Sequence, residues 1–160
     1  MVSAMHRAIV EYNMLEEGDK VAVGISGGKD SLTLLACLSQ YKKQVKYNFE
    51  LVAVAVDIFG DSDYSKIEEF CNKLSVKLVV ERTNINKVVF EVRQEKNPCS
   101  LCANLRRGIL NSVAERLGCN KVALGHHADD LVQTFFMSVA KENRLSTFWP
   151  KIYLSRKNIY

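Results

Sequence analysis

Four short apolar runs recur along the chain and alternate with longer amphipathic segments. Each run contains valine, is four to six residues long and is bounded by polar or turn-forming residues. Short apolar runs of this kind predict strands that are buried on both faces of a sheet. The expected strands are Lys20–Ile25, Leu51–Val56, Lys77–Val80 and Lys121–Leu124.

The segments between these runs carry apolar residues at helical spacing. Glu17-Gly18-Asp19 is expected to stop the first helix, and Gly118 a later one. The polar stretch Asn84–Asn97 fits either a loop or a short helix. The expected helices are Met5–Leu15, Asp30–Leu38, Tyr64–Leu74, Leu101–Leu117 and Asp129–Ala140.

The alternation of buried strands with helices of about ten residues or more predicts an α/β fold. We expect a doubly wound, Rossmann-like parallel sheet with helices on both faces. Such sheets bind ligands beyond the carboxyl ends of their strands. Two loops with conspicuous chemistry follow Ile25 and Leu124, at that edge of the predicted sheet.

Length and composition are those of an ordinary globular domain. The chain has 160 residues, of which 48% are hydrophobic and 25% charged, with neither an internal repeat nor a Pro/Gly linker. One domain over residues 1–160 is therefore expected. The amino-terminal segment lacks a signal-peptide pattern, and no apolar run approaches the ~18–20 residues that cross a membrane. We expect a cytoplasmic protein without membrane contact.

The first conspicuous loop is Ser26-Gly27-Gly28-Lys29-Asp30-Ser31. Two glycines let backbone N–H groups approach a ligand, and the amino end of the following helix favours an anion. Ser26 and Ser31 add hydroxyls, and Asp30 can cap the helix or hold Mg²⁺. The loop is not a Walker A motif, because Val23 stands where the first glycine is required. A plain glycine turn is the alternative, and the whole hexapeptide after a buried strand favours a phosphate site.

The second loop is Gly125-His126-His127-Ala128-Asp129-Asp130. Gly125 permits close approach to a ligand, whereas Asp129 and Asp130 fit a nucleotide or Mg²⁺ site or, more simply, a helix N-cap. The two histidines are adjacent and would point apart, which argues against zinc. Asp57 directly follows the second expected strand and is assigned to the same nucleotide site.

Two of the five cysteines, Cys99 and Cys102, form a Cys-x-x-Cys pair just before or within the first turn of a helix. Without a secretory signal the thiols are expected to be reduced, and a helix amino end favours the thiolate. One such pair fits half a zinc site, a redox pair or chance, because zinc or an iron–sulfur cluster needs more ligands. Cys37, Cys71 and Cys119 are expected to be packing residues.

The net charge of +4 is concentrated at the end of the chain. Residues 141–160 hold five basic residues against Glu142 alone, and the remainder balances at 17 basic and 17 acidic. This segment, with Arg106 and Arg107, suits a polyanion such as nucleic acid. A solvated face is the alternative interpretation for both features.

The hexapeptide SGGKDS after a valine-rich strand resembles the PP-loop of the N-type ATP pyrophosphatases, an adenine nucleotide alpha-hydrolase-like superfamily. The resemblance implies that the loop holds the β- and γ-phosphates of ATP, which leave as pyrophosphate. Ser26, Gly27, Gly28, Asp30 and Ser31 would be the phosphate-loop residues. The resemblance leaves the role of Lys29 open.

Three segments in order resemble the tRNA 2-thiocytidine synthetases: IVEYNMLEEGDKVAVGISGGKDSLTLL, CSLCANLRRGIL and KVALGHHADDLVQTFFM. The resemblance runs from about His6 to Met137. That family adenylates cytidine 32 of tRNA with ATP and Mg²⁺ and replaces O2 with sulfur. It holds a [4Fe–4S] cluster with three cysteines, of which Cys99 and Cys102 match the first two. The third has no counterpart in this chain, and the stretch after Met137 departs from the family's pattern.

The resemblance implies an ATP-dependent tRNA sulfurtransferase with Asp30, Cys99 and Cys102 as catalytic residues. Its partners would be tRNA, contacted by Arg106 and Arg107, and a sulfur donor such as a cysteine desulfurase. We expect the chain to lack the family's carboxyl-terminal portion, and the sequence leaves open whether it forms a homodimer. The alternatives are a related ATP pyrophosphatase acting on another substrate, such as tRNA uridine, and a non-catalytic nucleotide- or metal-binding module.

Overall fold

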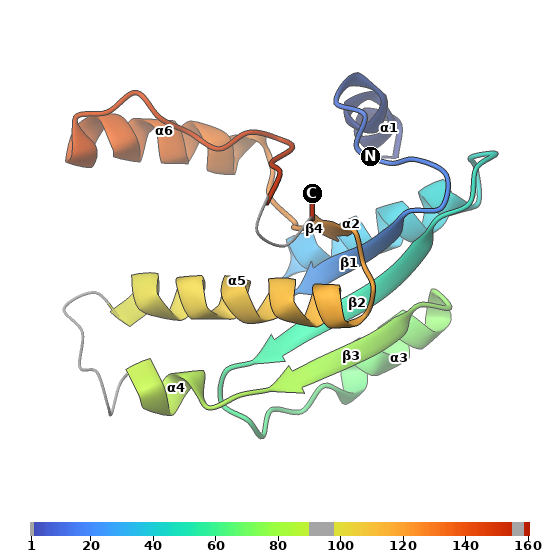
Figure 1. Cartoon of the computed structure of the whole chain (residues 1–160), viewed down its shortest axis with the longest axis horizontal. Coiled ribbons are helices and arrows are strands. Elements are labelled where there is room, and N and C mark those ends of the chain that lie inside the picture. Colours follow the sequence, from blue (N-terminus) through green and yellow to red (C-terminus); the bar gives the residue numbers. More distant parts are fainter. Residues whose placement is uncertain (1, 90–97, 155–158) are drawn as a thin grey trace.

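The computed structural model describes residues 2–89, 98–154 and 159–160. Four parallel strands form one sheet in the order β3-β2-β1-β4 (Figure 1). The α/β parallel sheet predicted from the apolar runs is thereby confirmed. The strands are β1 (Lys20–Ile25), β2 (Glu50–Asp57), β3 (Lys77–Arg82) and β4 (Lys121–Ala123).

The strand order reverses direction at β1. From β1 the chain moves to β2 and then to β3 on one side, and it returns to place β4 on the other side. The carboxyl ends of β1 and β4 therefore flank a topological switch point, where open α/β sheets bind ligands. Both of the loops singled out in the sequence leave from these two strands.

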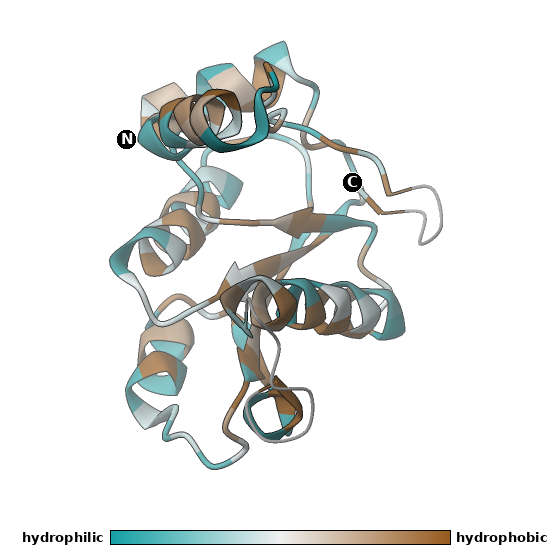
Figure 2. Cartoon of the chain, turned by 90° about the vertical axis from the view of Figure 1, so that its left-hand side faces the viewer, coloured by the Kyte–Doolittle hydropathy of each residue, from teal (hydrophilic) through white to brown (hydrophobic). Residues whose placement is uncertain are grey.

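Helices cover both faces of the sheet. One core contains residues of α1 (Val2–Glu11), α2 (Lys29–Lys42) and α3 (Ser65–Lys73), packed against alternate side chains of β1 and β2. The other contains residues of α4 (Ile85–Lys87) and α5 (Pro98–Arg116). Figure 2 shows the apolar strands lying between these helices. The sheet is thus buried on both faces, which explains the unbroken apolar runs in its strands.

The first helix ends earlier than expected. Its apolar spacing predicts a helix over Met5–Leu15, but α1 ends at Glu11, and Asn13 adopts a left-handed conformation with φ +48°. Asparagine tolerates this conformation and can end a helix. Met14 and Leu15 still pack against the first core. They are apolar because they are partly buried, although they do not belong to the helix.

A buried ion pair joins the amino ends of β1 and β4. Lys121 Nζ lies 2.7 Å from Asp19 Oδ2, and the two side chains are only 8% and 6% exposed. Asn120 Nδ2 donates to the other Asp19 oxygen at 2.7 Å. Burial raises the pKa of Asp19, but the bonds from Lys121 and Asn120 outweigh it and hold that pKa below its ordinary value. No motif or spacing in the sequence indicates this pair.

The last helix, α6 (Ala128–Glu142), projects from the carboxyl end of β4 (Figure 1). Among the described helices and strands, none packs extensively against it. The following strap, residues 143–154, runs back along it, and Asn143 ends the helix with φ +49°. Backbone bonds join Tyr160 to Asn120 and Val122 at the outer edge of β4.

The cysteines are all free thiols. Cys71 and Cys119 are buried, as expected for packing residues, and burial raises the pKa of both. Cys37 is half-buried. Within the described ranges, no helix is both long and apolar enough to span a bilayer.

Candidate functional site at the switch point

The glycine loop turns sharply as it leaves β1. Gly27 has φ +81°, a conformation that glycine adopts without strain. The loop then enters α2, whose N-cap is Gly28 and carries no side-chain cap. The first N–H groups of a helix have no partner within the helix. The uncapped start of α2 therefore gives the loop the means to bind an anion.

The two loop serines hold the loop's shape. The Ser31 hydroxyl donates to the carbonyl oxygen of Gly28 at 2.9 Å, and Ser31 is 5% exposed. Ser26 Oγ lies 3.2 Å from Ser31 Oγ and accepts from the N–H of Gly28 at 3.3 Å. Ser31 therefore organises the loop from beneath, while Ser26 lies at its exposed surface.

Lys29 and Asp30 form an exposed ion pair at the mouth of the loop. Lys29 Nζ lies 2.7 Å from Asp30 Oδ1, and the side chains are 84% and 46% exposed. The bond from Asp30, with a smaller contribution from Asp130, raises the pKa of Lys29. The sequence leaves two roles open to Asp30, capping α2 or holding Mg²⁺. Asp30 does not cap α2, because Gly28 is the N-cap. An exposed cation beside open N–H groups suits a polyphosphate.

The two loops touch at Gly125. A Cβ atom built on Gly125 would lie 2.9 Å from the Asp30 carbonyl carbon and 2.9 Å from the Ser31 nitrogen. Both neighbours are backbone atoms, which cannot turn aside as a flexible side chain can. Glycine is thus needed at this position so that the loop after β4 can lie directly on the loop after β1. The two sequence motifs form one site.

The acidic residues of the second loop differ in their roles. Asp130 Oδ2 accepts from the N–H of His127, the N-cap of α6, at 3.0 Å. This bond, with the nearby His127 and His126, lowers the pKa of Asp130 despite some desolvation. Asp129 is 84% exposed, and its carboxylate is 3.9 Å from His127 Nδ1. Neither aspartate is the N-cap itself, and Asp129 is the more available to a cation.

Asp57 ends β2 at the same edge of the sheet but is buried, at 1% exposed. Its carboxylate accepts from the N–H and hydroxyl of Ser62 at 3.0 and 2.7 Å and from the N–H of Phe59 at 3.1 Å. Arg82 Nη1 lies 3.3 Å from Asp57 Oδ2. Burial raises the pKa of Asp57, but these bonds outweigh it and lower that pKa. Asp57 shapes the loop after β2, and its assignment to the nucleotide stays a prediction.

The cysteine pair lies at the amino end of α5: Cys99 is in the first turn, as predicted, and Cys102 begins the second. Cys99 is exposed and Cys102 is half-buried against the second core. Among the described residues, no three His, Cys, Asp or Glu side chains come together as a metal site. A [4Fe–4S] cluster held by protein alone takes four thiolates. The pair by itself therefore does not fit the whole cluster, although its two thiols can supply two ligands.

Arg106 and Arg107 follow the cysteines on α5 and face differently. Arg106 is half-buried. Burial and the nearby Asp57 raise the pKa of Tyr64, and the charge of Arg106 reduces that rise. Arg107 is exposed and donates to Asn104 at 3.0 Å. Of the basic carboxyl-terminal residues, Arg156 and Lys157 lie outside the described residues.

Comparison with known proteins agrees with this geometry. A family model described as a PP-loop domain matches residues 2–149. A protein of Polaromonas naphthalenivorans named tRNA-cytidine(32) 2-sulfurtransferase is 47% identical over 148 residues, which are 91% of this chain and 47% of that protein. A protein of the same name from Pelobacter propionicus is 35% identical, covering 98% of this chain and 64% of that protein. The chain spans about half the length of most of the curated relatives it matches.

Two solved structures share the fold. The U34-tRNA thiolase NcsA from Methanococcus maripaludis, with its [4Fe–4S] cluster, aligns with a TM-score of 0.71 and 29% identity. The alignment covers 88% of this chain and 50% of NcsA. A predicted tRNA methyltransferase subunit from Methanocaldococcus jannaschii aligns with a TM-score of 0.53 and 22% identity, covering 88% of this chain and 65% of the other, which shows likeness of fold alone.

Proposed function

The chain belongs to the PP-loop domain family, and we propose that it binds ATP at the switch point and uses it to activate a tRNA base for thiolation. The observation that carries the proposal is the contact of Gly125 with the backbone of Asp30 and Ser31. This contact joins the phosphate loop to the second motif at the place where open α/β sheets take nucleotides.

Each residue of the loop has a different role in the proposed binding of ATP. The uncapped first turn of α2 and the Gly27-Gly28 backbone receive the β- and γ-phosphates. Lys29 exchanges its bond with Asp30 for one with a phosphate oxygen. Asp30, thereby freed, and the exposed Asp129 would hold Mg²⁺, which prefers carboxylate oxygens. Ser31, buried beneath the loop, keeps these groups in place.

The proposed chemistry begins with adenylation of the base carbonyl. The O2 atom of cytidine 32 attacks the α-phosphorus of ATP, and pyrophosphate leaves from the loop at Ser26–Ser31. The outer sulfur of a cysteine persulfide, supplied by a donor such as a cysteine desulfurase, then attacks C2, and AMP departs with the original oxygen. A second thiol attacks the cysteine sulfur of the resulting S–S bond, which leaves sulfur on C2 and forms a disulfide between the two cysteines. Cys99 is exposed at the amino end of α5, where its free thiol is accessible to receive a sulfur atom.

The RNA substrate needs cationic contacts outside the nucleotide loop. Exposed Arg107 can bind a tRNA phosphate, and half-buried Arg106 is a second candidate for such a contact. The names of the relatives support tRNA as the partner.

Pyrophosphate release tests the proposal directly. Purified protein should release pyrophosphate from Mg-ATP, and tRNA bearing cytidine 32 should stimulate the release. Replacing that cytidine with uridine supplies the matched control RNA. ATP binding with no effect of either tRNA would contradict the assignment and favour a nucleotide-binding module without catalysis.

A second candidate substrate is the wobble uridine, because NcsA is named a U34-tRNA thiolase. The identity of 47% to a cytidine(32) enzyme against 29% to NcsA favours cytidine. Mass analysis of tRNA from cells that lack the protein distinguishes the two. Loss of 2-thiocytidine supports the first proposal, whereas loss of 2-thiouridine alone supports the second.

A further inference from the structure

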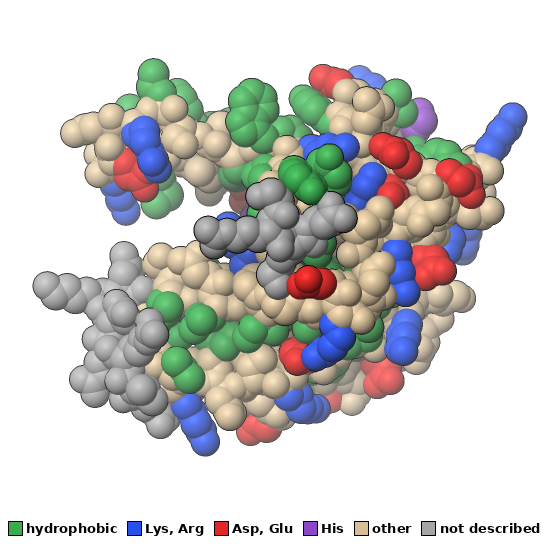
Figure 3. All heavy atoms as spheres, viewed as in Figure 1, with side chains coloured by type: hydrophobic (Ala, Val, Ile, Leu, Met, Phe, Trp, Pro, Cys, Tyr) green, Lys and Arg blue, Asp and Glu red, His purple; other side chains and the backbone are tan. Residues whose placement is uncertain are grey.

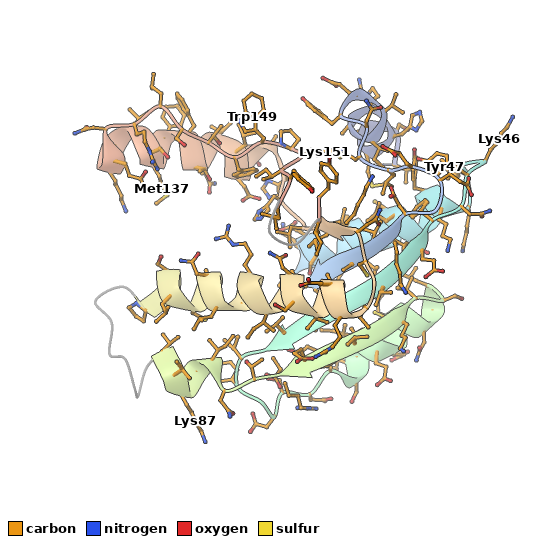
Figure 4. The ribbon with its side chains drawn as sticks, in the orientation of Figure 1. Lys46, Tyr47, Lys87, Met137, Trp149 and Lys151 are labelled. Atoms are coloured by element: carbon orange, nitrogen blue, oxygen red, sulfur yellow. The ribbon has the colours of Figure 1, made fainter. Side chains whose placement is uncertain are left out.

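The strap, residues 143–154, holds the single tryptophan of the chain in an exposed position. Trp149 is 75% exposed, whereas its neighbour Phe148 is half-buried. Pro150 disfavours a helical backbone at Trp149, and in an extended backbone successive side chains point to opposite sides. Figure 3 shows hydrophobic side chains gathered along the outer edge of α6 and the strap, and in Figure 4 Trp149 stands clear of the ribbon. The indole ring therefore offers a large planar surface to a ligand.

Phe148 links the strap to the proposed nucleotide site. The centroid of its ring lies 5.3 Å from that of His126. His126 directly follows Gly125, the residue that lies against the backbone of the phosphate loop. The tryptophan that follows Phe148 is therefore held at a fixed place relative to the site, on the outer side of the strap.

The strap is also fixed to the body on both sides of the tryptophan. Before it, Thr147 Oγ1 donates to the carbonyl oxygen of Leu131 at 3.1 Å. After it, Lys151 Nζ donates to the carbonyl oxygen of Asn13 and lies 4.5 Å from the ring centroid of Tyr160. A ring presented by an anchored segment can bind a ligand with little further loss of conformational entropy.

The surroundings of the tryptophan are positively charged. The strap contains Arg144 and Lys151 and no acidic residue. Arg144 is paired with Glu142, but the two partners of Lys151 are neutral, so the charge of Lys151 remains for an anion. An exposed aromatic ring beside a cation is typical of surfaces that bind single-stranded nucleic acid, because the ring stacks on a base and the cation contacts a phosphate.

The proposed reaction requires a base that has left its stack, so that its O2 atom can reach the α-phosphorus of ATP. Enzymes that carry out chemistry on a base take it out of the stack. Unpaired bases near the target then lose a stacking partner, and an aromatic side chain supplies a substitute.

We propose that Trp149 stacks on an unpaired base of the tRNA near the base that is thiolated, and that Lys151 contacts an adjoining phosphate. The strap then holds the RNA beside the nucleotide site. The inference rests on the proposed function, because it takes tRNA as the substrate. The cations of the strap favour RNA over a protein partner, since charged residues are depleted from the core of protein interfaces.

Tryptophan fluorescence tests the stacking directly, because the emission of the chain's single tryptophan comes from Trp149 alone. Titration of the whole chain with tRNA should quench this emission, since stacking on a base quenches indole fluorescence. A blunt RNA duplex of equal length offers phosphates without unpaired bases and should cause little quenching. Equal quenching by both RNAs, or unchanged emission with tRNA that filter binding shows to be bound, would overturn the proposal.

Substitution of the ring measures its contribution to RNA binding. Trp149→Ala should raise the dissociation constant for tRNA about 5- to 150-fold, the range for one base stacked on an aromatic side chain. Trp149→Phe keeps a ring and should restore most of the affinity. Leu145→Ala, which shortens an apolar side chain that is 82% exposed in the same strap, should bind like the wild type. Circular dichroism and unchanged affinity for ATP verify that each variant is folded.

Release of pyrophosphate separates this inference from the function on which it rests. In Trp149→Ala the tRNA concentration that gives half-maximal stimulation should rise, and the rate at saturating tRNA should persist. If that concentration is the same as in the wild type, the stacking role is wrong and the proposed function stands. If tRNA stimulates neither protein, the proposed function fails and the inference fails with it. Unchanged tRNA affinity with slower sulfur transfer from a persulfide donor would overturn the inference in favour of a protein surface.

Discussion

Two lysine–aspartate pairs lie at opposite ends of the same sheet, and both have an N–O separation of 2.7 Å. At the amino ends of the strands, Lys121 and Asp19 are 8% and 6% exposed. At the carboxyl ends, Lys29 and Asp30 are 84% and 46% exposed. The chemistry and the distance are the same, but the surroundings differ.

Burial decides what each pair does. Lys121 and Asp19 have lost most of their water, so each depends on the other, and Asn120 satisfies the remaining oxygen of Asp19. Lys29 and Asp30 are still hydrated, so their pairing contributes little to stability and is easily exchanged. The first pair fixes β4 beside β1, and the second is available to a ligand. Substitutions at the buried end should therefore change stability, and substitutions at the exposed end should change binding.

Lys121→Met should have the largest effect on stability. It leaves Asp19 buried without its cation, which costs about 3–5 kcal/mol of unfolding free energy. Urea unfolding measures the loss. The double variant Asp19→Asn with Lys121→Met removes both charges and should be more stable than the single variant. If the single variant unfolds like the wild type, the pair does not support the fold.

Asp57→Asn should have the next largest effect. Asp57 lies at the carboxyl ends of the strands, near the candidate site, but it is buried like Asp19 and Lys121 at the amino ends. Its carboxylate oxygens accept hydrogen bonds from Phe59 and Ser62. Replacing one oxygen by an amide nitrogen should cost about 1–3 kcal/mol in urea unfolding. Asp61→Asn, at an exposed position of the same loop, is the control and should be neutral. Equal losses in both variants would refute the role given to Asp57.

Lys29→Met should leave stability unchanged and weaken ATP binding about tenfold, because a charged bond to phosphate is lost. Calorimetric titration measures the affinity, and urea unfolding of the same sample provides the stability. If Lys29→Met lowered the unfolding free energy and left the affinity for ATP unchanged, the exposed pair would support the fold and would not serve binding.

The pH dependence of the unfolding free energy should show a smaller effect of the buried pair. The pKa of Asp19 is lower in the folded protein than its ordinary value of 3.8. Its contribution is therefore complete above about pH 4 and declines as the pH falls through the folded pKa. Unfolding curves between about pH 5 and 2 should show this decline in the wild type. The double variant at 19 and 121 should show a shallower decline, and an identical slope would count against the pair.

Much of the fold is predictable because strands buried on two faces leave a local signal. The run Lys20–Ile25 coincides with β1, and the run at Leu51–Val56 gains one residue at each end in β2. The pairing of Asp19 with Lys121 has no local signal, because its members lie far apart in the chain. The early end of α1 depends on one left-handed residue, Asn13, which apolar spacing does not reveal.

The candidate site is predictable as motifs but not as contacts. The loops at Ser26–Ser31 and Gly125–Asp130 stand out in the sequence because their residue types suit phosphate and cations. Which side chains face the ligand depends on packing: Ser31 is buried beneath its loop, and Asp57 is occupied by its own loop. The closeness of Gly125 to the Asp30–Ser31 backbone follows from the sheet bringing the two loops together.

That closeness provides the sharpest test of a shared nucleotide site, which is calorimetric titration of Gly125→Ala with Mg-ATP. A Cβ 2.9 Å from the Asp30–Ser31 backbone must force the loops apart, so affinity should fall at least about tenfold. Gly108→Ala, where a Cβ meets nothing within 4 Å, should bind ATP like the wild type. Wild-type affinity in a folded Gly125→Ala protein would contradict a nucleotide site shared by the two loops.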